Sequence, residues 1–226
     1  MNVGSTKEKN PERRISITPD TSKSLKSLGL NVFLEKGYGE TLGFDDQEYK
    51  DKGVEILNDP KELLSRSNLV CKVNLPSEEE FKNIKENSNL IVSNYNYEKD
   101  KKFHQNFYLK SKINIFALNF LPRITRAQSM DVLSSQANLA GYRAVIESIH
   151  EFEKAVPMMM TAAGTIPAAK VLVIGAGVAG LQAIATAKRL GAIVSATDVR
   201  VTAKEQVESL GGKFLTVEGS ENLETK

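Results

Sequence analysis

The sequence predicts an α/β protein with two Rossmann-like, doubly wound lobes and parallel sheets, the second lobe being only half present. Three observations support this fold class. Short apolar runs alternate with polar segments of helix length from the first residues onward, as expected for βα units around a parallel sheet. A glycine-rich turn follows the apolar strand pattern at residues 171–174. After residue 170 only three strand patterns remain, whereas a complete dinucleotide-binding fold has six strands.

Residues 1–121 form the first predicted lobe. Capping signals support its helix boundaries: Pro19 and Asp20 stand at the start of the first helix, Gly29 follows its end, and Asp59 precedes Pro60 at the start of another. The expected strands lie near residues 2–5, 31–35, 54–57, 69–74, 90–95 and 113–120. The expected helices lie near residues 20–28, 45–52, 60–66, 77–86 and 98–110.

Residues 122–168 are predicted to connect the two lobes. Pro122 and a polar stretch stop the preceding strand. Apolar residues at helical spacing then predict a long helix over 130–155, which Pro157 ends. Small residues along its first half permit close packing, so we interpret this helix as wedged between two packed bodies. The residues that follow are interpreted as core or hinge packing and a turn, at 158–160, Gly164 and Pro167.

Residues 169–226 predict half of a second lobe. The strands are expected at 171–174, 192–197 and 214–217, and the helices at 178–190 and 201–210. The first of these strands is apolar on both faces, like a central strand, yet it would form the edge of a three-stranded sheet. We therefore expect the chain to be truncated or to need a complementing piece.

Charge and cysteine content narrow the classes of function. Thirty basic and twenty-eight acidic residues are interspersed and give a net charge of +2, so nothing indicates nucleic-acid or anionic-lipid binding. The single cysteine, Cys71, cannot form an intramolecular disulfide, and no apolar stretch approaches the length of a membrane helix. No residues have metal-ligand spacing. We expect a soluble protein of a reducing compartment, without a metal and without direct membrane insertion.

A glycine motif suggests a nucleotide site. Gly175, Gly177 and Gly180 fit the pattern G-x-G-x-x-G between a strand and a helix that opens at Val178. The first glycine permits the tight turn, the second lets the backbone approach a pyrophosphate, and the third lets the helix pack closely on the strand. The helix N-terminus then faces the anion with free N–H groups. The alternative is a glycine turn of the same shape that binds no nucleotide.

Asp198 suggests which nucleotide binds. It stands eighteen residues after Gly180, at the end of the second strand, where a carboxylate accepts both ribose hydroxyls. A carboxylate there repels a 2′-phosphate, so NAD is favoured over NADP. Arg200 leaves alternatives open, because it could receive a phosphate, lie on the adenine or stay in solvent.

The segment between the lobes carries a second set of candidates. Gln128 and Ser134 suit a carboxamide, while Arg123 and Asp131 could hold the loop by a charge-assisted bond. Because clefts between α/β bodies bind ligands, we expect this segment to face the nicotinamide end of the cofactor. The alternative is an ordinary helix start with solvated charges, capped by Ser129 or Asp131.

Two basic residues of the first lobe could also reach an anionic group. Arg14 follows the first strand, and Lys72 interrupts an apolar strand. The alternative for each is a solvated charge at the edge of the sheet.

Together these residues and their surroundings resemble the NAD(H)-binding part of the alpha subunits of proton-translocating NAD(P) transhydrogenases, within the alanine dehydrogenase/pyridine nucleotide transhydrogenase family. The similarity spans the whole chain. Its most specific stretches are residues 122–136, 140–144, 157–167, 175–180, 196–200 and 208–214.

The resemblance implies a function and partners. The chain would bind NADH between its two lobes and pass a hydride directly to NADP(H) held on a partner domain in its oxidised form, while a transmembrane subunit couples this step to proton translocation. It would be a cytoplasmic homodimer, peripheral at the inner face of the membrane through its partner subunits. Because direct hydride transfer needs two rings near contact distance, positioning would supply most of the catalysis.

The resemblance also implies residue roles. The nicotinamide ring would be organised by Arg123, Gln128, Asp131 and Ser134, with Tyr142 on the helix beside it. The adenosine side would be contacted by Asp198, Val199 and Arg200.

Two other functions stay open. Alanine dehydrogenase has the same two-lobed architecture, and residues like Arg14 and Lys72 bind substrate there. That enzyme also needs a histidine shortly after the fifth strand, and residues 93–96 contain none, so chemistry on pyruvate is not expected. A non-catalytic NAD-binding module is the second alternative, because the second lobe is incomplete.

Overall fold

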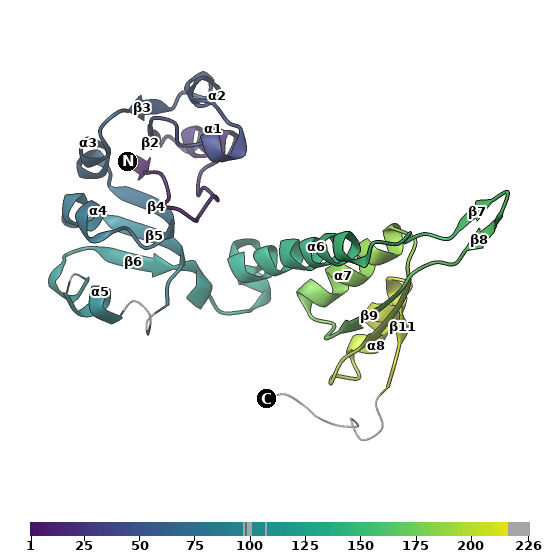
Figure 1. Cartoon of the computed structure of the whole chain (residues 1–226). Coiled ribbons are helices and arrows are strands. Elements are labelled where there is room, and N and C mark those ends of the chain that lie inside the picture. The colour runs from purple at the N-terminus through teal and green to yellow at the C-terminus, as the bar shows by residue number, and fades with distance from the viewer. Residues whose placement is uncertain (97, 99–100, 107, 217–226) are drawn as a thin grey trace. The chain divides into compact units, whose positions relative to one another are not determined.

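The computed structural model describes residues 1–96, 98, 101–106 and 108–216. The chain divides into two compact units, Met1–Asp131 and Val132–Lys226. Each unit is an α/β layer structure with a parallel sheet, as the sequence predicts (Figure 1).

The first unit contains a six-stranded sheet in the order β3-β2-β1-β4-β5-β6. Every strand pair in it is parallel, which is the doubly wound arrangement. In chain order the strands and α-helices are β1 (Asn2–Ser5), α1 (Pro19–Ser27), β2 (Asn31–Glu35), α2 (Asp46–Asp51), β3 (Glu55–Leu57), α3 (Pro60–Arg66), β4 (Leu69–Asn74), α4 (Glu78–Asn83), β5 (Asn89–Asn94), α5 (Lys101–Asn106) and β6 (Asn114–Ala117). The unit also has short 3-10 turns, η1 (Glu40–Leu42), η2 (Tyr108–Lys110), η3 (Leu118–Phe120) and η4 (Thr125–Met130).

Local capping fixes the starts of the helices. The Thr18 side chain accepts a hydrogen bond from the backbone of Thr21, one residue ahead of the Pro19 that opens α1. Asp45 and Ser77 form capping boxes with the glutamates three residues on, at the starts of α2 and α4. Such caps satisfy backbone N–H groups that have no partner within the helix, which explains why the predicted boundaries agree closely.

Both faces of the first sheet are covered. Along β2, Phe33 belongs to one buried cluster, while Val32 and Leu34 belong to another. Successive strand residues point to opposite faces, so the two clusters lie on the two sides of the sheet. Leu63 of α3 packs in the first cluster and Tyr49 of α2 in the second.

Two expectations for this unit need correction or a limit. The strand expected over 113–120 ends at Ala117 and continues as the 3-10 turn η3. Asn119 explains the early end, because its side chain accepts from the backbone N–H of Tyr95 at 3.0 Å and donates to its carbonyl oxygen at 2.8 Å. A side chain thus replaces the strand ladder. Within the helix expected over 98–110, residues 99–100 and 107 lie outside the described residues.

The second unit contains a three-stranded parallel sheet in the order β11-β10-β9. Its elements are α6 (Val132–Phe152), β7 (Met159–Thr161), β8 (Gly164–Ile166), β9 (Lys170–Ile174), α7 (Val178–Arg189), β10 (Ile193–Thr197), α8 (Ala203–Ser209) and β11 (Lys213–Phe214). Residue 217 of the third expected strand lies outside the described residues. Val194 and Ala196 of β10 are buried with residues of α7 and α8, whereas Ile174 of β9 is 80% exposed. In the described part of the chain β9 is an edge strand with one covered face.

Within this unit the long helix α6 packs against α7. A Cβ atom added to Gly141 would lie 2.0 Å from the carbonyl oxygen of Ala179, so only glycine allows this approach of the two helices. The small residues along α6 therefore serve a close helix contact inside the second unit, as their size predicts.

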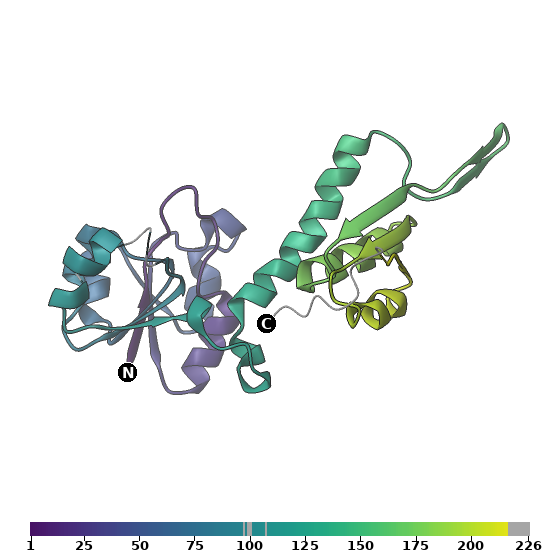
Figure 2. The ribbon, with the colours of Figure 1, turned by 90° about the horizontal axis from the view of Figure 1, so that it is seen from below.

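The interpretation of residues 158–160 as core or hinge packing is wrong. Residues 159–161 pair antiparallel with 164–166, and the hairpin projects from the rest of its unit (Figures 1 and 2). Met160 is 80% exposed. Thr161 closes the turn through a hydrogen bond from its hydroxyl to the carbonyl oxygen of Gly164, so local pairing rather than burial orders this segment.

Candidate functional site

The glycine motif forms a turn at the carboxyl ends of β9 and β10. Gly175 has a φ of +95°, a conformation that residues with a Cβ atom rarely adopt. Its N–H donates to the carbonyl oxygen of Thr197 at 2.8 Å, so the turn begins where the two strands end together. In open α/β sheets, ligands bind outside this end of the strands.

The other two glycines meet different requirements. A Cβ atom on Gly180 would lie 1.8 Å from the carbonyl oxygen of Gly175, so this position needs glycine for the fold itself. A Cβ atom on Gly177 would have no neighbour within 4 Å. Nothing in the described protein requires glycine there, and the open space suits a group from outside the chain.

The N-terminus of α7 is available to such a group. Gly177 is its N-cap residue and provides no side-chain hydrogen bond, while Val178 in the first turn is exposed. The twelve-residue helix therefore begins with N–H groups that no capping side chain satisfies. Together with the positive end of the helix dipole they favour an anion.

Asp198 lies beside this turn. Its Oδ2 accepts from the backbone N–H of Ala176 at 2.7 Å, and its Oδ1 accepts from the backbone N–H of Arg200 at 2.8 Å. The side chain of Asp198 is 6% exposed. Hydrogen bonds from the Arg200 side chain, with those from the two backbone groups, lower the pKa of this carboxyl to about 2, so it is ionised at neutral pH.

Arg200 takes none of the three positions that the sequence leaves open for it. Its Nε lies 3.1 Å from Oδ1 of Asp198 and its Nη2 lies 3.3 Å from Oδ2. The side chain is nevertheless 48% exposed. Val199, between the two, is exposed.

The residues predicted for the nicotinamide end are divided between the two units. Arg123 and Gln128 are exposed, and Asp131 is the last residue of the first unit. Ser134 and Tyr142 belong to α6 in the second unit, where Ser134 is half-buried and Tyr142 is exposed. Their roles at a nicotinamide ring stay a prediction.

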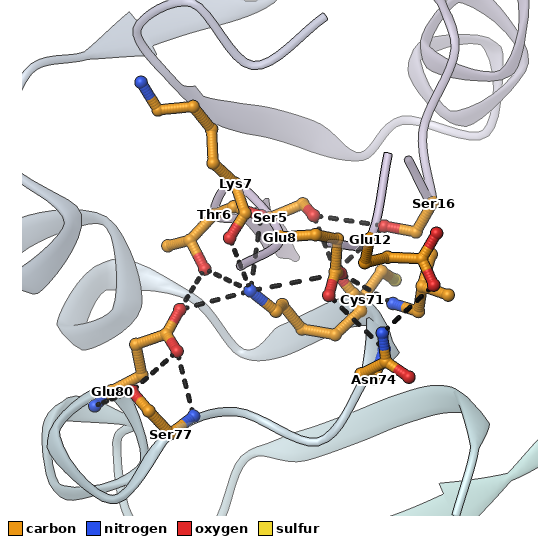
Figure 3. Close-up of polar contacts among 12 residues, drawn as sticks. Ser5, Thr6, Lys7, Glu8, Glu12, Ser16, Cys71, Asn74, Ser77 and Glu80 are labelled. Atoms are coloured by element: carbon orange, nitrogen blue, oxygen red, sulfur yellow. Dashed lines mark hydrogen bonds and ion pairs between the residues drawn. The ribbon is translucent and has the colours of Figure 1, made fainter. Parts of the chain in front are cut away.

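Lys72 is not a solvated edge charge. Its side chain, on β4, is 2% exposed. Its Nζ donates to Thr6 Oγ1 at 3.0 Å, to the carbonyl oxygen of Lys7 at 2.8 Å and to Glu80 Oε1 at 3.1 Å (Figure 3). The ammonium group is therefore saturated by the protein's own acceptors.

Two glutamates compensate the charge of Lys72 in different ways. Burial works to raise the pKa of Glu80, but Lys72 and the hydrogen bonds from Ser77 and Thr6 outweigh it and lower the value to about 2. Burial dominates at Glu8 and raises its pKa, although Lys72 lies 3.9 Å away and Val73 N–H donates to its carboxylate. Direct contact with the ammonium group distinguishes the two carboxylates.

Arg14 is also paired within the first unit. Its Nε and Nη2 donate to the two carboxylate oxygens of Glu12, at 2.8 Å and 2.7 Å. This two-pronged bond lowers the pKa of Glu12 to about 2. Sequence reasoning found the two basic residues but missed their partners Glu8, Glu12 and Glu80. A lysine in an apolar strand signals that a carboxylate must be near, but not which one.

Among the described residues no group of three or more histidine, cysteine, aspartate or glutamate side chains could hold a metal ion. In the same residues no helix combines the length and apolarity needed to cross a bilayer.

Comparisons with known proteins agree with this geometry. Residues 4–140 match the family model "Alanine dehydrogenase/PNT, N-terminal domain", and residues 144–226 match "Alanine dehydrogenase/PNT, C-terminal domain". The chain belongs to the alanine dehydrogenase/PNT family. Its fold, with Rossmann-like units around parallel sheets, is that of this family.

Within the family, the chain is more similar to transhydrogenases. It is 48% identical to the first polypeptide of the divided NAD(P) transhydrogenase subunit alpha of Rhodospirillum rubrum, over 96% of this chain and 58% of that protein. A crystal structure of transhydrogenase from Sinorhizobium meliloti has 47% identity and a TM-score of 0.89, over 98% of this chain and 63% of that one. Alanine dehydrogenase of Methanococcus maripaludis is 28% identical over 96% of this chain and 58% of that protein. The chain thus spans less than two thirds of the length of these relatives.

Proposed function

We propose that this chain binds NAD(H) at the glycine turn and Asp198, and that it takes part in direct hydride transfer between NADH and NADP⁺ held on a partner domain. The observation that carries the proposal is the buried, ionised Asp198 bonded to the glycine turn beside an uncapped helix N-terminus. The two features match the two polar parts of the adenosine half of the cofactor. Similarity to transhydrogenases at 48% identity supports the reaction.

The residues of the turn would divide the work of binding the adenosine half. The N–H groups at the start of α7, from Val178 onward, would hold the pyrophosphate, and Gly177 would leave room for it. Asp198 would accept the ribose hydroxyls, and Val199 and Arg200 would line the adenosine side. Gly175 and Gly180 would act indirectly, by setting the shape of the turn.

At the other end of the cofactor, the chain would position a ring rather than perform acid–base chemistry. NADH itself would supply the hydride. The nicotinamide would be oriented by Arg123, Gln128, Asp131, Ser134 and Tyr142. Because the transfer needs two rings near contact distance, holding one of them in place is the main catalytic contribution expected of these side chains.

The proposed partners are an NADP(H)-binding subunit and a transmembrane subunit that couples hydride transfer to proton translocation. The name of the Rhodospirillum rubrum relative, which marks it as one portion of a subunit alpha, supports an assembly of several polypeptides. We further propose a homodimer, located at the cytoplasmic face of the membrane through those subunits, with residues 1–121, 122–168 and 169–226 as first lobe, connection and nucleotide-binding half.

Alanine dehydrogenase is the second candidate, and the first unit argues against it. The two cationic side chains that would bind its substrate are Arg14 and Lys72. Glu12 holds the first through both carboxylate oxygens, and Glu80 contacts the second. A substrate carboxylate would have to displace these internal carboxylates. Residues 93–96 also lack the histidine expected for that enzyme.

The reaction can be tested by mixing the chain with the NADP(H)-binding domain of a transhydrogenase, NADPH and an oxidised NAD analogue that absorbs light when reduced. Reduction of the analogue, lost in the Asp198→Ala variant, is the expected result. Reduction of NAD⁺ by L-alanine without the partner domain would support the second candidate. Binding of NADH without either reaction would indicate a non-catalytic module.

A further inference from the structure

We propose that Arg200 is a specificity-determining residue that competes with the cofactor's ribose for Asp198 and would stabilise a 2′-phosphate in its place. This inference rests on the proposed NAD(H) site. It assigns to Arg200 a role that lowers affinity for NADH while keeping some affinity for NADPH.

The Asp198 carboxylate has no acceptor position left. A carboxylate offers about four lone-pair sites on its two oxygens. Oδ1 accepts from the backbone N–H and the Nε of Arg200, and Oδ2 accepts from the backbone N–H of Ala176 and from Nη2 of Arg200. Two ribose hydroxyls can bind only after donors have left.

Of these donors, only the guanidinium group can leave easily. The two backbone donors are fixed, because Ala176 is buried in the glycine turn and the N–H of Arg200 lies two residues along the chain from Asp198. The guanidinium group is on a side chain that is 48% exposed. Besides Asp198, it contacts the carbonyl oxygen of Ala176, and that distance is a long 3.4 Å.

The displaced arginine would meet a 2′-phosphate. The guanidinium fork matches the oxygens of a phosphate as well as those of a carboxylate. A phosphate on the 2′ oxygen would stand next to Asp198, which repels it, and within reach of Arg200, which attracts it. The same side chain therefore disfavours NADH and favours NADPH.

Calorimetric titration of four forms of the chain with NADH and with NADPH tests this inference. The forms are wild type, Arg200→Ala, Arg200→Lys and the control Arg189→Ala, which changes an exposed arginine in the last turn of α7, the end of the helix remote from the glycine turn. Arg200→Ala is expected to bind NADH roughly three- to ten-fold more tightly, since an exposed ion pair is weak and its loss frees the carboxylate. The same variant is expected to bind NADPH at least three-fold more weakly.

Arg200→Lys separates charge from geometry. Lysine keeps the positive charge near a phosphate but cannot contact both carboxylate oxygens as a fork. NADPH affinity should stay near that of wild type, while NADH affinity should rise toward that of the alanine variant. Arg189→Ala should change neither.

Three results would overturn the inference, each in a recognisable way. NADH affinity that falls or stays unchanged in Arg200→Ala would contradict competition and leave the NAD(H) site intact. NADPH affinity unchanged in that variant would contradict the phosphate role. Wild type that binds neither nucleotide would overturn this inference and the proposed function together.

Discussion

The backbone N–H of Ala176 donates a 2.7 Å hydrogen bond to Oδ2 of Asp198, twenty-two residues away in the sequence. This bond ties the glycine turn after β9 to the end of β10. Asp198 therefore has a structural contact inside the turn as well as a proposed contact with the ribose, and substitutions there must distinguish the two.

Asp198→Ala is expected to weaken NADH binding by about 1–2 kcal/mol, the scale of lost charge-assisted hydrogen bonds. Asp198→Asn retains an oxygen that can accept from the N–H of Ala176 but loses the negative charge. It should weaken NADH binding as well, while discriminating less against NADPH than wild type does. Fluorescence titration with both nucleotides measures the two effects, and equal NADH affinity in wild type and alanine variant would contradict the assignment.

Gly180→Ala and Gly177→Ala form a matched pair within the motif. The first places a Cβ atom 1.8 Å from the carbonyl oxygen of Gly175 and should destabilise the second unit by about 1–3 kcal/mol, the typical cost of overpacking. The second meets no neighbour and has a φ of −77°, so thermal stability should be unchanged. NADH binding should nevertheless weaken in Gly177→Ala, because the added methyl group occupies the space proposed for the pyrophosphate. Equal melting temperatures for the two variants would be the contrary result.

Lys72→Met is expected to destabilise the first unit strongly. It removes the ammonium group between Glu8 and Glu80 and leaves buried carboxylate charge uncompensated, which costs about 3–5 kcal/mol in comparable sites. Lys112→Met is the control, because Lys112 pairs with Glu86 on the exposed surface. Urea unfolding measures both, and a loss below about 1 kcal/mol for Lys72→Met would refute the structural role of the cluster.

The two carboxylates beside Lys72 should give opposite dependences of stability on pH. The folded pKa of Glu80 is about 2 against an ordinary 4.5, so its stabilising contribution is present above about pH 4.5 and is lost as the pH falls toward 2. The folded pKa of Glu8 is raised, so wild type should lose stability as the pH rises through 4.5. Unfolding free energies of Glu80→Gln and Glu8→Gln, each subtracted from that of wild type across this range, should change in opposite directions. Parallel changes would contradict the distinction.

Much of the first sheet could be predicted from the sequence because its signals are local. The strands at 2–5, 31–35 and 69–74 agree with β1, β2 and β4 residue for residue. Apolar runs and capping residues act over a few positions, so single-sequence patterns contain them. The glycine turn was predictable for the same reason, since its requirements follow from backbone sterics.

What the sequence did not reveal depends on contacts between distant residues. Asn119 ends β6 early through Tyr95, and Glu80 reaches Lys72 from a different element. Met158 and Met160 were expected to be buried because they are apolar, but a hairpin between 159 and 166 leaves them exposed. Burial depends on what packs against a residue, which composition alone does not specify.

The proposed NAD(H) site is tested most directly by titrating the wild-type chain with NADH and with NADPH under identical conditions, with bound nucleotide followed by fluorescence. We expect saturable binding of NADH at a lower dissociation constant than that of NADPH, because the ionised Asp198 accepts ribose hydroxyls and repels a 2′-phosphate. Equal affinity for the two nucleotides, or no saturable NADH binding, would contradict it.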